Sequence, residues 1–285
     1  MHSELSPTAP LACLGTVAPI GFDDFASPEW LGAYRDLGCT RVQAYRAQNK
    51  EVSVSQMRDY LAAGQMPCDS LHGIYGEQYD PSAPDEEARK FAVDALRREG
   101  ELALQLGGDL VVVHCSTIRR DGVSPAERAM RMKQLSMSMQ ELGTFGQQMG
   151  VRYAFENMPD YHACGSDVVK LVQLLDDTAA ANTGLCLDTG HANMTGDAVE
   201  AVNQVGNQMI YVHLCDNSGV EDEHEMPGKG TLDLHNLALG FHLSGYAGTI
   251  MLEVFYSLPR LQAMIDEGLG QVLGEFIRTV RQGDS

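Results

Sequence analysis

Residues 109–114 read DLVVVH, a short apolar run that ends in a histidine. Continuous apolar character of this length is typical of a β-strand buried on both faces of a parallel sheet. An amphipathic helical pattern at residues 85–106 precedes the run and is closed by Gly107-Gly108. A second helical pattern follows at residues 124–148, opened by Ser124-Pro125. This region is therefore predicted to be a helix, a buried strand and a helix.

The same alternation extends over almost the whole chain. Strands are predicted at residues 11–18, 40–45, 66–72, 109–114, 151–156, 183–188, 208–213 and 248–253. Helices are predicted at residues 27–37, 54–63, 85–106, 124–148, 166–175, 197–205, 232–243 and 259–280. Eight strand–helix units without a composition break predict an α/β fold, a closed (β/α)8 barrel in a single domain of residues 11–285. A doubly wound open sheet is the alternative, but the glycine-rich phosphate turn expected after an early strand is missing.

The composition restricts the location and partners of the protein. No apolar run reaches the roughly 18 residues that span a bilayer, and residues 1–10 lack the pattern of a signal peptide. We therefore expect a cytoplasmic protein with a disordered lead-in at residues 1–10 and no membrane partner. Acidic residues outnumber basic ones by 39 to 20, a net charge of −19 that argues against a nucleic-acid partner.

Cysteine usage points to a reducing compartment. The chain has seven cysteines and no C-x-x-C motif. Five of them lie in or at the end of apolar strand-like runs: Cys13, Cys68, Cys115, Cys186 and Cys215. Small buried cysteines of this kind predict neither a disulfide framework nor a cysteine zinc site.

Potential metal ligands stand at the ends of six consecutive predicted strands. These residues are His72, His114, Glu156, Asp188, His213 and Glu253. In a barrel all strand ends converge on one mouth, where the active sites of such barrels lie. Residues 211–230, YVHLCDNSGVEDEHEMPGKG, add Asp222 and His224 directly after the seventh strand. Imidazole and carboxylate groups in this arrangement are typical ligands of a divalent metal.

Several motifs resemble the xylose-isomerase-like TIM barrel superfamily. They are FENMPD (155–160), DTGH (188–191), VHLCDN (212–217), PGKGTLDL (227–234) and MLEV (251–254). The similarity spans nearly the whole chain in order. The superfamily includes ketose epimerases, inosose-processing enzymes, dehydroshikimate dehydratases and endonuclease IV, the AP endonuclease family 2.

The resemblance implies a central four-ligand metal site made of Glu156, Asp188, His213 and Glu253. Three carboxylates and one imidazole favour Mn²⁺, Mg²⁺, Co²⁺, Fe²⁺ or Zn²⁺. The histidine that matches His191 binds substrate in epimerases and a metal in endonuclease IV. The alternative is a histidine hydrogen-bonded at a helix start.

The resemblance also leaves the number of metals open. Four residues match the additional zinc ligands of endonuclease IV: His72, His114, Asp222 and His224. A second or third metal ion would fit this pattern. The acidic charge and the lack of basic or aromatic-rich loops argue against DNA repair. The arginine that epimerases often place six residues after the metal histidine is Gly219 here, which departs from their pattern.

Other side chains carry weaker predictions. Lys229 is predicted either to contact an anionic substrate or to be a solvated loop charge. Asn157 either contacts a substrate hydroxyl or caps its strand end. Tyr45, Tyr75 and Phe255 are candidates for the pocket wall, with core packing as the alternative. No nucleotide-binding loop is present, so no nucleotide cofactor is expected.

We predict a divalent-metal-dependent isomerase or epimerase of a small keto-sugar, polyol or cyclitol, phosphorylated or not. Glu156 and Glu253 would transfer the proton, and His191 would orient a substrate oxygen. A dehydratase or lyase on the same metal site, or a multinuclear phosphate-ester hydrolase, is the alternative. The expected partner is a small-molecule substrate, and the resemblance suggests a homodimer or homotetramer.

Overall fold

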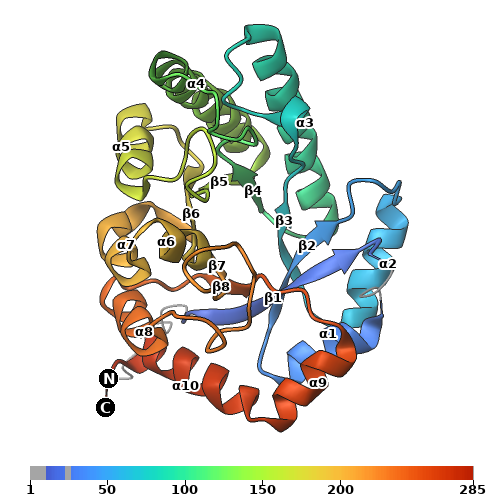
Figure 1. The fold of residues 1–285 in the computed structure, drawn as a ribbon. Helices are drawn as coiled ribbons and strands as arrows, with labels where there is room; N and C mark the ends of the chain where they lie inside the picture. The colour runs from blue at the N-terminus through green and yellow to red at the C-terminus, as the bar shows by residue number, and fades with distance from the viewer. Residues whose placement is uncertain (1–10, 23–26, 285) are drawn as a thin grey trace, which may run out of the picture.

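Eight parallel strands close into a barrel in chain order, β1 to β8, in the computed structural model of the protein (Figure 1). The structure describes residues 11–22 and 27–284, so the lead-in predicted at residues 1–10 lies outside the described residues. The strands are β1 (Cys13–Ile20), β2 (Arg41–Arg46), β3 (Cys68–His72), β4 (Leu110–His114), β5 (Arg152–Glu156), β6 (Thr183–Asp188), β7 (Met209–Leu214) and β8 (Thr249–Leu252). The predicted (β/α)8 barrel is confirmed.

Helices surround the barrel on the outside (Figure 1). They are α1 (Pro28–Asp36), α2 (Val54–Gly64), α3 (Glu86–Leu106), α4 (Pro125–Met149), α5 (Val168–Thr178), α6 (Thr189–Thr195), α7 (Ala198–Val205), α8 (Leu234–Leu243), α9 (Leu258–Asp266) and α10 (Leu269–Gln282). Two 3₁₀ turns, η1 (Glu77–Tyr79) and η2 (Gly206–Gln208), complete the described elements. In the part of the chain that the structure describes, no helix has the length and apolarity that crossing a membrane would require.

Local sequence signals set several helix ends. The Ser124 hydroxyl accepts a hydrogen bond from the Glu127 amide at 3.1 Å, which satisfies one of the free amides at the start of α4. The Asp85 carboxylate caps α3 in the same way, through the Ala88 amide at 2.9 Å. Gly107 ends α3 in the left-handed conformation, as its position after the apolar pattern predicts.

Side chains that point inward from the strands fill the barrel interior in successive layers. A small inner core consists of Leu110, Val112, Ala154, Cys186, Tyr211 and Met251. A larger apolar core lies between the strands and the helices. Because these layers close the interior of the barrel, a ligand can enter only from the ends of the strands.

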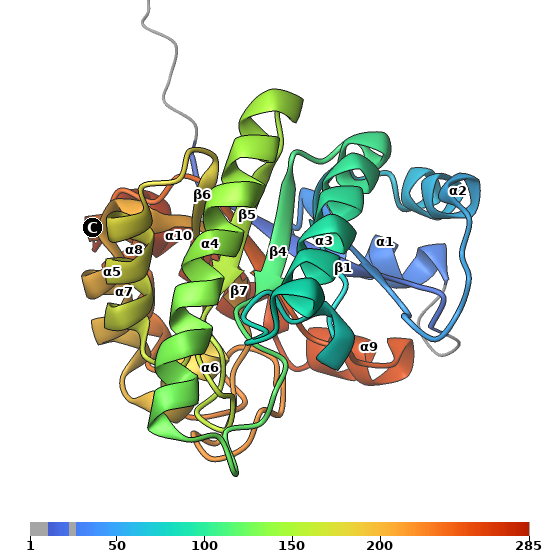
Figure 2. The same ribbon diagram turned by 90° about the horizontal axis from the view of Figure 1, so that it is seen from above.

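The sequence predictions were wrong for two helical regions. Residues 259–280 form two helices, α9 and α10, because Gly268 between them adopts a φ of +100° that ends the helical path. The short helix α6, directly after β6, was not predicted. Figure 2 shows α6 and the loop between β7 and α8 at the same end of the barrel.

Candidate metal and active site

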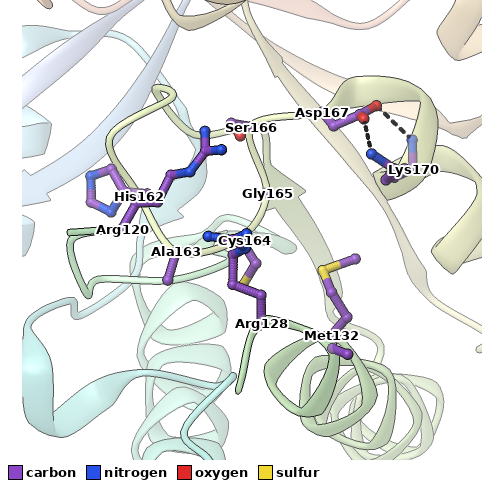
Figure 3. A pocket seen from close by; sticks show the side chains of 11 residues that line it. Arg120, Arg128, Met132, His162, Ala163, Cys164, Gly165, Ser166, Asp167 and Lys170 are labelled. Carbon is purple, nitrogen blue, oxygen red and sulfur yellow. Dashed lines mark hydrogen bonds and ion pairs between the residues drawn. The ribbon is translucent and has the colours of Figure 1, made fainter. Parts of the chain in front are cut away.

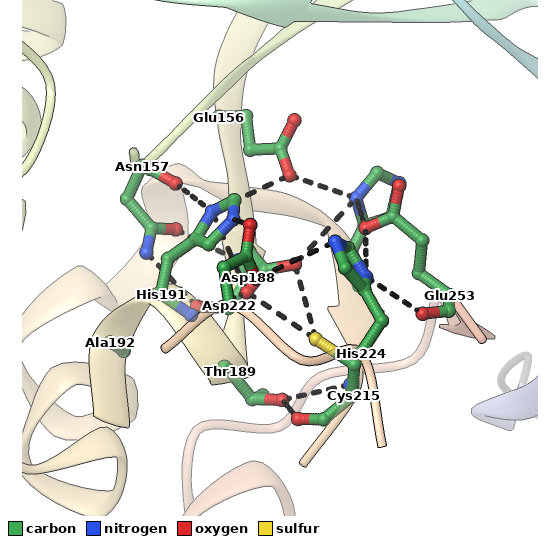
Figure 4. Close-up of polar contacts among 12 residues, drawn as sticks. Glu156, Asn157, Asp188, Thr189, His191, Ala192, Cys215, Asp222, His224 and Glu253 are labelled. Atoms are coloured by element: carbon green, nitrogen blue, oxygen red, sulfur yellow. Dashed lines mark hydrogen bonds and ion pairs between the residues drawn. The ribbon is translucent and has the colours of Figure 1, made fainter. Parts of the chain in front are cut away.

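The strand ends bring the predicted ligand residues together at the barrel mouth. The residues lie at a strand end or within one residue of it: His72, His114, Glu156, Asp188, His213 and Glu253. Figure 4 shows the side chains around this point, with those of Glu156, Asp188, His191, Asp222, His224 and Glu253 gathered together. Strand order alone therefore assembles a site from residues that are up to 181 positions apart, from His72 to Glu253.

Four buried residues form what we call the central group: Glu156, Asp188, His213 and Glu253. The Nδ1 atom of His213 lies 3.0 Å from Glu156 Oε1 and 3.0 Å from Glu253 Oε2. The same atom is 4.0 Å from Asp188 Oδ2. Each residue offers one ligand atom to a set in which all atoms lie within 4.8 Å of one another.

The two glutamates of the central group are held in the ionised form. Burial would raise the pKa of Glu156, but the charge of His213 and the hydrogen bond from its ring hold it at about 2. Burial also opposes ionisation of Glu253, yet His213 and His224 keep its pKa well below the usual range. Both side chains are therefore carboxylates at neutral pH and need positive charge beside them.

Asp188 has a different role within the central group. Burial raises the pKa of Asp188 to about 7, against the opposing charge of His191. Its Oδ1 atom accepts a hydrogen bond from the His191 amide at 2.7 Å and so caps helix α6. One carboxylate oxygen is thus used by the fold, and the other faces His213.

The donor set of the central group fits a divalent metal ion. Two of its buried polar atoms, His213 Nε2 and Glu156 Oε2, have no hydrogen-bond partner among the described residues. Buried polar atoms are normally satisfied, so these atoms suit the binding of a ligand. Three carboxylates and an imidazole match the hard oxygen and nitrogen ligands of Mn²⁺, Co²⁺, Fe²⁺, Mg²⁺ and Zn²⁺.

Two further groups of ligand-type side chains flank the central group. The first contains His72, His114 and the shared Glu156, with His114 Nε2 at 3.4 Å from Glu156 Oε2. Burial lowers the pKa of His114 to about 3, so its ring is neutral and able to bind a cation. The structure therefore brings both predicted histidines to the mouth.

The second flanking group contains His191, Asp222 and His224. Asp222 lies between the two rings, 3.3 Å from His191 Nε2 and 3.5 Å from His224 Nε2. Burial would lower the pKa of both histidines, but neighbouring carboxylates, Asp222 among them, raise each to about 10. His191 also stands in the first turn of α6, with its Nδ1 atom 2.7 Å from the Asn157 carbonyl oxygen.

Asp216 organises the loop that carries Asp222 and His224. Its carboxylate accepts hydrogen bonds from the amides of Gly228, Gly230 and Leu232, each at 3.0 Å. A side chain at Gly230 would lie 2.2 Å from the Asn217 carbonyl oxygen, so only glycine fits there. Asp216 is thus a structural residue that folds the loop back over the mouth.

A cavity of about 300 Å³ opens onto these groups. The residues that line it include Glu156, Glu253, His114, His191, Asp222 and His224. Its aromatic wall contains Tyr45 and Tyr75, whose hydroxyl oxygens are 3.2 Å apart. Phe255 packs against the Tyr45 ring, with 5.1 Å between the ring centroids. A volume of this size suits a ligand as small as a monosaccharide.

Two predicted substrate contacts have partners within the protein. The Asn157 side chain donates to the Asp188 carbonyl at 2.9 Å and accepts from the Asp188 amide at 2.7 Å. Lys229 pairs with Glu267 at 3.0 Å on the surface and does not line the cavity. Their first alternatives, a substrate contact in each case, receive no support from this geometry.

Three residues that line the cavity were not predicted from the sequence: Thr117, Tyr161 and His162. All three belong to loops, where no periodicity marks the direction of a side chain. The motif FENMPD ends one residue before Tyr161, so an extension of that motif into the following loop is the signal that was available.

The fold and the site together define a (β/α)8 barrel with clustered carboxylate and histidine side chains at its mouth that could hold a divalent metal. Residues 20–272 match the model of the family described as xylose isomerase-like TIM barrel. The chain belongs to this family, as its motifs suggested.

Curated relatives are more distant. An uncharacterized protein of Methanocaldococcus jannaschii, MJ1311, is 29% identical over 178 residues, 61% of this chain and 60% of the relative. A second protein of that organism, MJ1614, is 26% identical over 154 residues, which cover 53% of this chain and 57% of the relative. The chain thus spans less than two thirds of either relative. Fructoselysine 3-epimerase of Escherichia coli O157:H7 is 20% identical over 232 residues, 78% of this chain and 82% of the epimerase.

Solved structures share the fold. L-ribulose 3-epimerase superposes with a TM-score of 0.76 at 18% identity, over 95% of this chain and 96% of its own. The 3-keto-D-glucoside 4-epimerase YcjR from E. coli gives a TM-score of 0.74 at 17% identity, over 94% and 99% of the two chains. At these identities the likeness shows the fold alone.

Proposed function

We propose that the protein is a divalent-metal-dependent isomerase or epimerase of a small keto-sugar, polyol or cyclitol. The observation that carries this proposal is the pair of buried carboxylates, Glu156 and Glu253, each 3.0 Å from His213 Nδ1 and both lining one cavity. Two ionised carboxylates at one small cavity suit a reaction in which a proton leaves one carbon and returns. The epimerases among the relatives and solved structures support the same class of reaction.

The central group would hold the metal through Glu156, Asp188, His213 and Glu253. When bound there, a divalent cation supplies Lewis-acid polarisation of a substrate carbonyl, which acidifies the neighbouring C–H bond.

The glutamates would transfer the proton. Glu156 Oε1 is held by His213, whereas Oε2 has no hydrogen-bond partner in residues 11–22 and 27–284 and would take the proton. Glu253 would return the proton to the second carbon or to the opposite face, or the two residues would act in the reverse order.

His191 would orient a substrate oxygen. Its ring lines the cavity and is fixed by the Asn157 carbonyl oxygen on one side and by Asp222 on the other. The ring direction is thus fixed, and His191 would contact the substrate by sharing its Nε2–H between Asp222 and a substrate oxygen.

The test is hydrogen exchange between solvent and substrate. Metal-loaded protein is incubated in D₂O with a panel of ketoses and cyclitols, and deuterium at carbon is measured by NMR. The Glu253→Gln variant is expected to lose about 10³-fold in exchange rate, the order of magnitude of a removed general acid or base. The matched control is Glu267→Gln, a surface glutamate that pairs with Lys229. An unchanged rate in Glu253→Gln would remove the glutamate mechanism.

A lyase or dehydratase is a close alternative because it begins with the same proton abstraction. It would then expel a hydroxyl group from the β-carbon. In the same NMR experiment this reaction produces an unsaturated product, whereas an epimerase produces only stereoisomers of the starting sugar.

A multinuclear hydrolase of phosphate esters is the second candidate function. The two flanking groups favour it, since they supply five ligand residues beyond the central group and share Glu156 with it. Two or three metal ions would generate hydroxide and stabilise the leaving oxygen. Mass spectrometry of metal content separates the candidates: about one metal per chain supports the isomerase, whereas two or three, lost on replacement of His114 or His224, support the hydrolase.

A further inference from the structure

A second cavity, of about 420 Å³, lies beside the catalytic one and has a different character. It lies between the loop after β4, the loop after β5 and the start of α4 (Figure 3). Its charged lining residues are Arg120, Arg128, Lys170 and Asp167. Positive charge is in excess here by two, although the chain as a whole carries −19.

The arginines of this basic cavity have donors to spare. Lys170 is paired with Asp167 at 2.6 Å, so these two charges offset one another. Arg128 donates one hydrogen bond, to the Val123 carbonyl at 3.3 Å. For the Arg120 guanidinium, the described part of the chain contains no hydrogen bond or ion pair. Two guanidinium groups are therefore available to a ligand at the same cavity.

The backbone around the basic cavity is fixed before any ligand binds. The loops after β4 and β5 pair through Arg120 N to the Tyr161 carbonyl at 2.6 Å and Ala163 N to the Ile118 carbonyl at 2.8 Å. Arg119 stacks on the Tyr161 ring, 4.6 Å from its centroid. Gly165 closes the cavity at a φ of +96°, where a side chain would lie 2.7 Å from Cys115 Cβ. A pre-organised frame of this kind lowers the entropic cost of binding.

His162 connects the two cavities, because it lines both of them. Its Nδ1 atom is buried and has no hydrogen-bond partner in the part of the chain that the structure describes. The two cavities are therefore neighbours on either side of this residue, and a ligand that occupied both would have to pass its ring.

We propose that the basic cavity binds the phosphate group of a phosphorylated substrate whose reacting carbons lie in the catalytic cavity. This inference rests on the proposed function for the position of those carbons. A phosphomonoester carries a charge of about −1.5 to −2 at neutral pH, which matches the two uncompensated charges. Arginine is suited to such a group, since its planar guanidinium donates two parallel hydrogen bonds to phosphate oxygens.

The test compares phosphorylated and free sugars. Binding to the metal-loaded full-length protein is measured by calorimetry for a panel of ketoses and cyclitols, each with and without a phosphate group. The tested variant is Arg120→Gln/Arg128→Gln. The matched control is Arg98→Gln/Arg278→Gln, which removes the same charge from two exposed arginines on α3 and α10. Thermal unfolding of each variant checks that the fold is intact.

Wild-type protein is expected to bind at least one phosphorylated sugar more tightly than its free counterpart. The Arg120→Gln/Arg128→Gln variant should weaken that binding by about tenfold or more, since charge-assisted hydrogen bonds are lost, and leave the free sugar unchanged. The control variant should bind both as the wild type does. Equal binding of phosphorylated and free sugars by the wild type, or equal loss for both in the variant, would overturn the proposal.

Two further results separate this inference from the proposed function. Arginine-dependent binding of a phosphorylated sugar without deuterium exchange would leave the phosphate site standing and reject the epimerase. Deuterium exchange of free sugars with no effect of the arginine variant would do the reverse. Inorganic phosphate is the last probe: if it binds through the arginines without competing with the sugar phosphate, the cavity is a separate anion site and the substrate assignment is wrong.

Discussion

Two polar clusters lie at opposite ends of the same barrel and are built differently. The lower cluster, at the amino ends of the strands, consists of Asp69, Ser70, Tyr211 and Thr249. Asp69 Oδ1 accepts from the Ser70 hydroxyl at 2.9 Å and from the Tyr211 hydroxyl at 3.1 Å, and Oδ2 accepts from Thr249 at 2.5 Å. One acid thus has three neutral donors.

The central group at the mouth places three acids around one imidazole. Within the described part of the chain, its buried atoms Glu156 Oε2 and His213 Nε2 have no hydrogen-bond partner. The difference shows how one fold separates stability from function: the lower cluster satisfies its polar atoms internally, whereas the mouth keeps polar atoms for a ligand. In barrels of this type the mouth carries the chemistry and the opposite end serves stability.

The largest expected difference between variants at the two ends is in how much a bound metal raises the free energy of unfolding. After treatment with a chelator, addition of Mn²⁺ or Zn²⁺ at 100 times its dissociation constant should raise the free energy of unfolding by about 2.7 kcal/mol. The His213→Ala variant should lose this gain, because it lacks the imidazole that lies beside both glutamates and would bind the metal with them. The measurement is thermal unfolding of each variant with and without the metal, so that the intrinsic cost of each substitution cancels.

A lower-cluster variant is the control for the metal experiment. Thr249→Val removes one hydroxyl from Asp69 and should keep the full stabilisation by the metal. If His213→Ala retained the gain, or if Thr249→Val lost it, the assignment of the metal to the mouth would be wrong.

The strand ends explain why so much of the site could be predicted. A parallel barrel forces successive strand ends to one side, so that the residue types at His114, Glu156 and Asp188 suffice to place a ligand cluster. The same logic could not find the lower cluster, because Asp69 and Tyr211 lie inside apolar strands and meet only when the barrel closes.

Loops and helix breaks lay beyond prediction for a different reason. Residues 259–280 have helical periodicity on both sides of Gly268, so the apolar pattern continues across the break and the glycine itself is the signal that marks it. Tyr161 and His162 reach the cavity by loop pairing, which has no periodic signature. Asn157 could be placed at the mouth, but its use in fixing the Asp188 backbone depends on a contact between two strands.

Removal of the acid from the lower cluster should cost stability without affecting turnover. Asp69→Ala leaves the hydroxyls of Tyr211 and Thr249 without their acceptor, which should lower the free energy of unfolding by about 2 kcal/mol. Denaturant unfolding measures this loss, and deuterium exchange at 25 °C should stay at the wild-type rate. The matched control is Asp109→Ala, which breaks a surface pair with Arg152 at 2.7 Å and should cost less than about 1 kcal/mol. A rate that fell with stability in Asp69→Ala would mean that the two ends are coupled.

The smallest effect expected is the part of the pH dependence of stability that Asp69 in the lower cluster contributes. Burial raises the pKa of Asp69 above its ordinary value of 3.8, although its hydroxyl donors oppose the shift. The folded protein therefore retains a proton at pH values where the unfolded chain has lost it, and the stability due to this group falls as the pH rises from 3.8 through the raised pKa. Asp69→Asn does not titrate, so its stability relative to the wild type should improve between pH 4 and pH 7, with Asp109→Asn showing no such trend. Denaturant unfolding at the two pH values measures the difference, and a trend of opposite sign would show that the hydroxyl donors outweigh burial at Asp69.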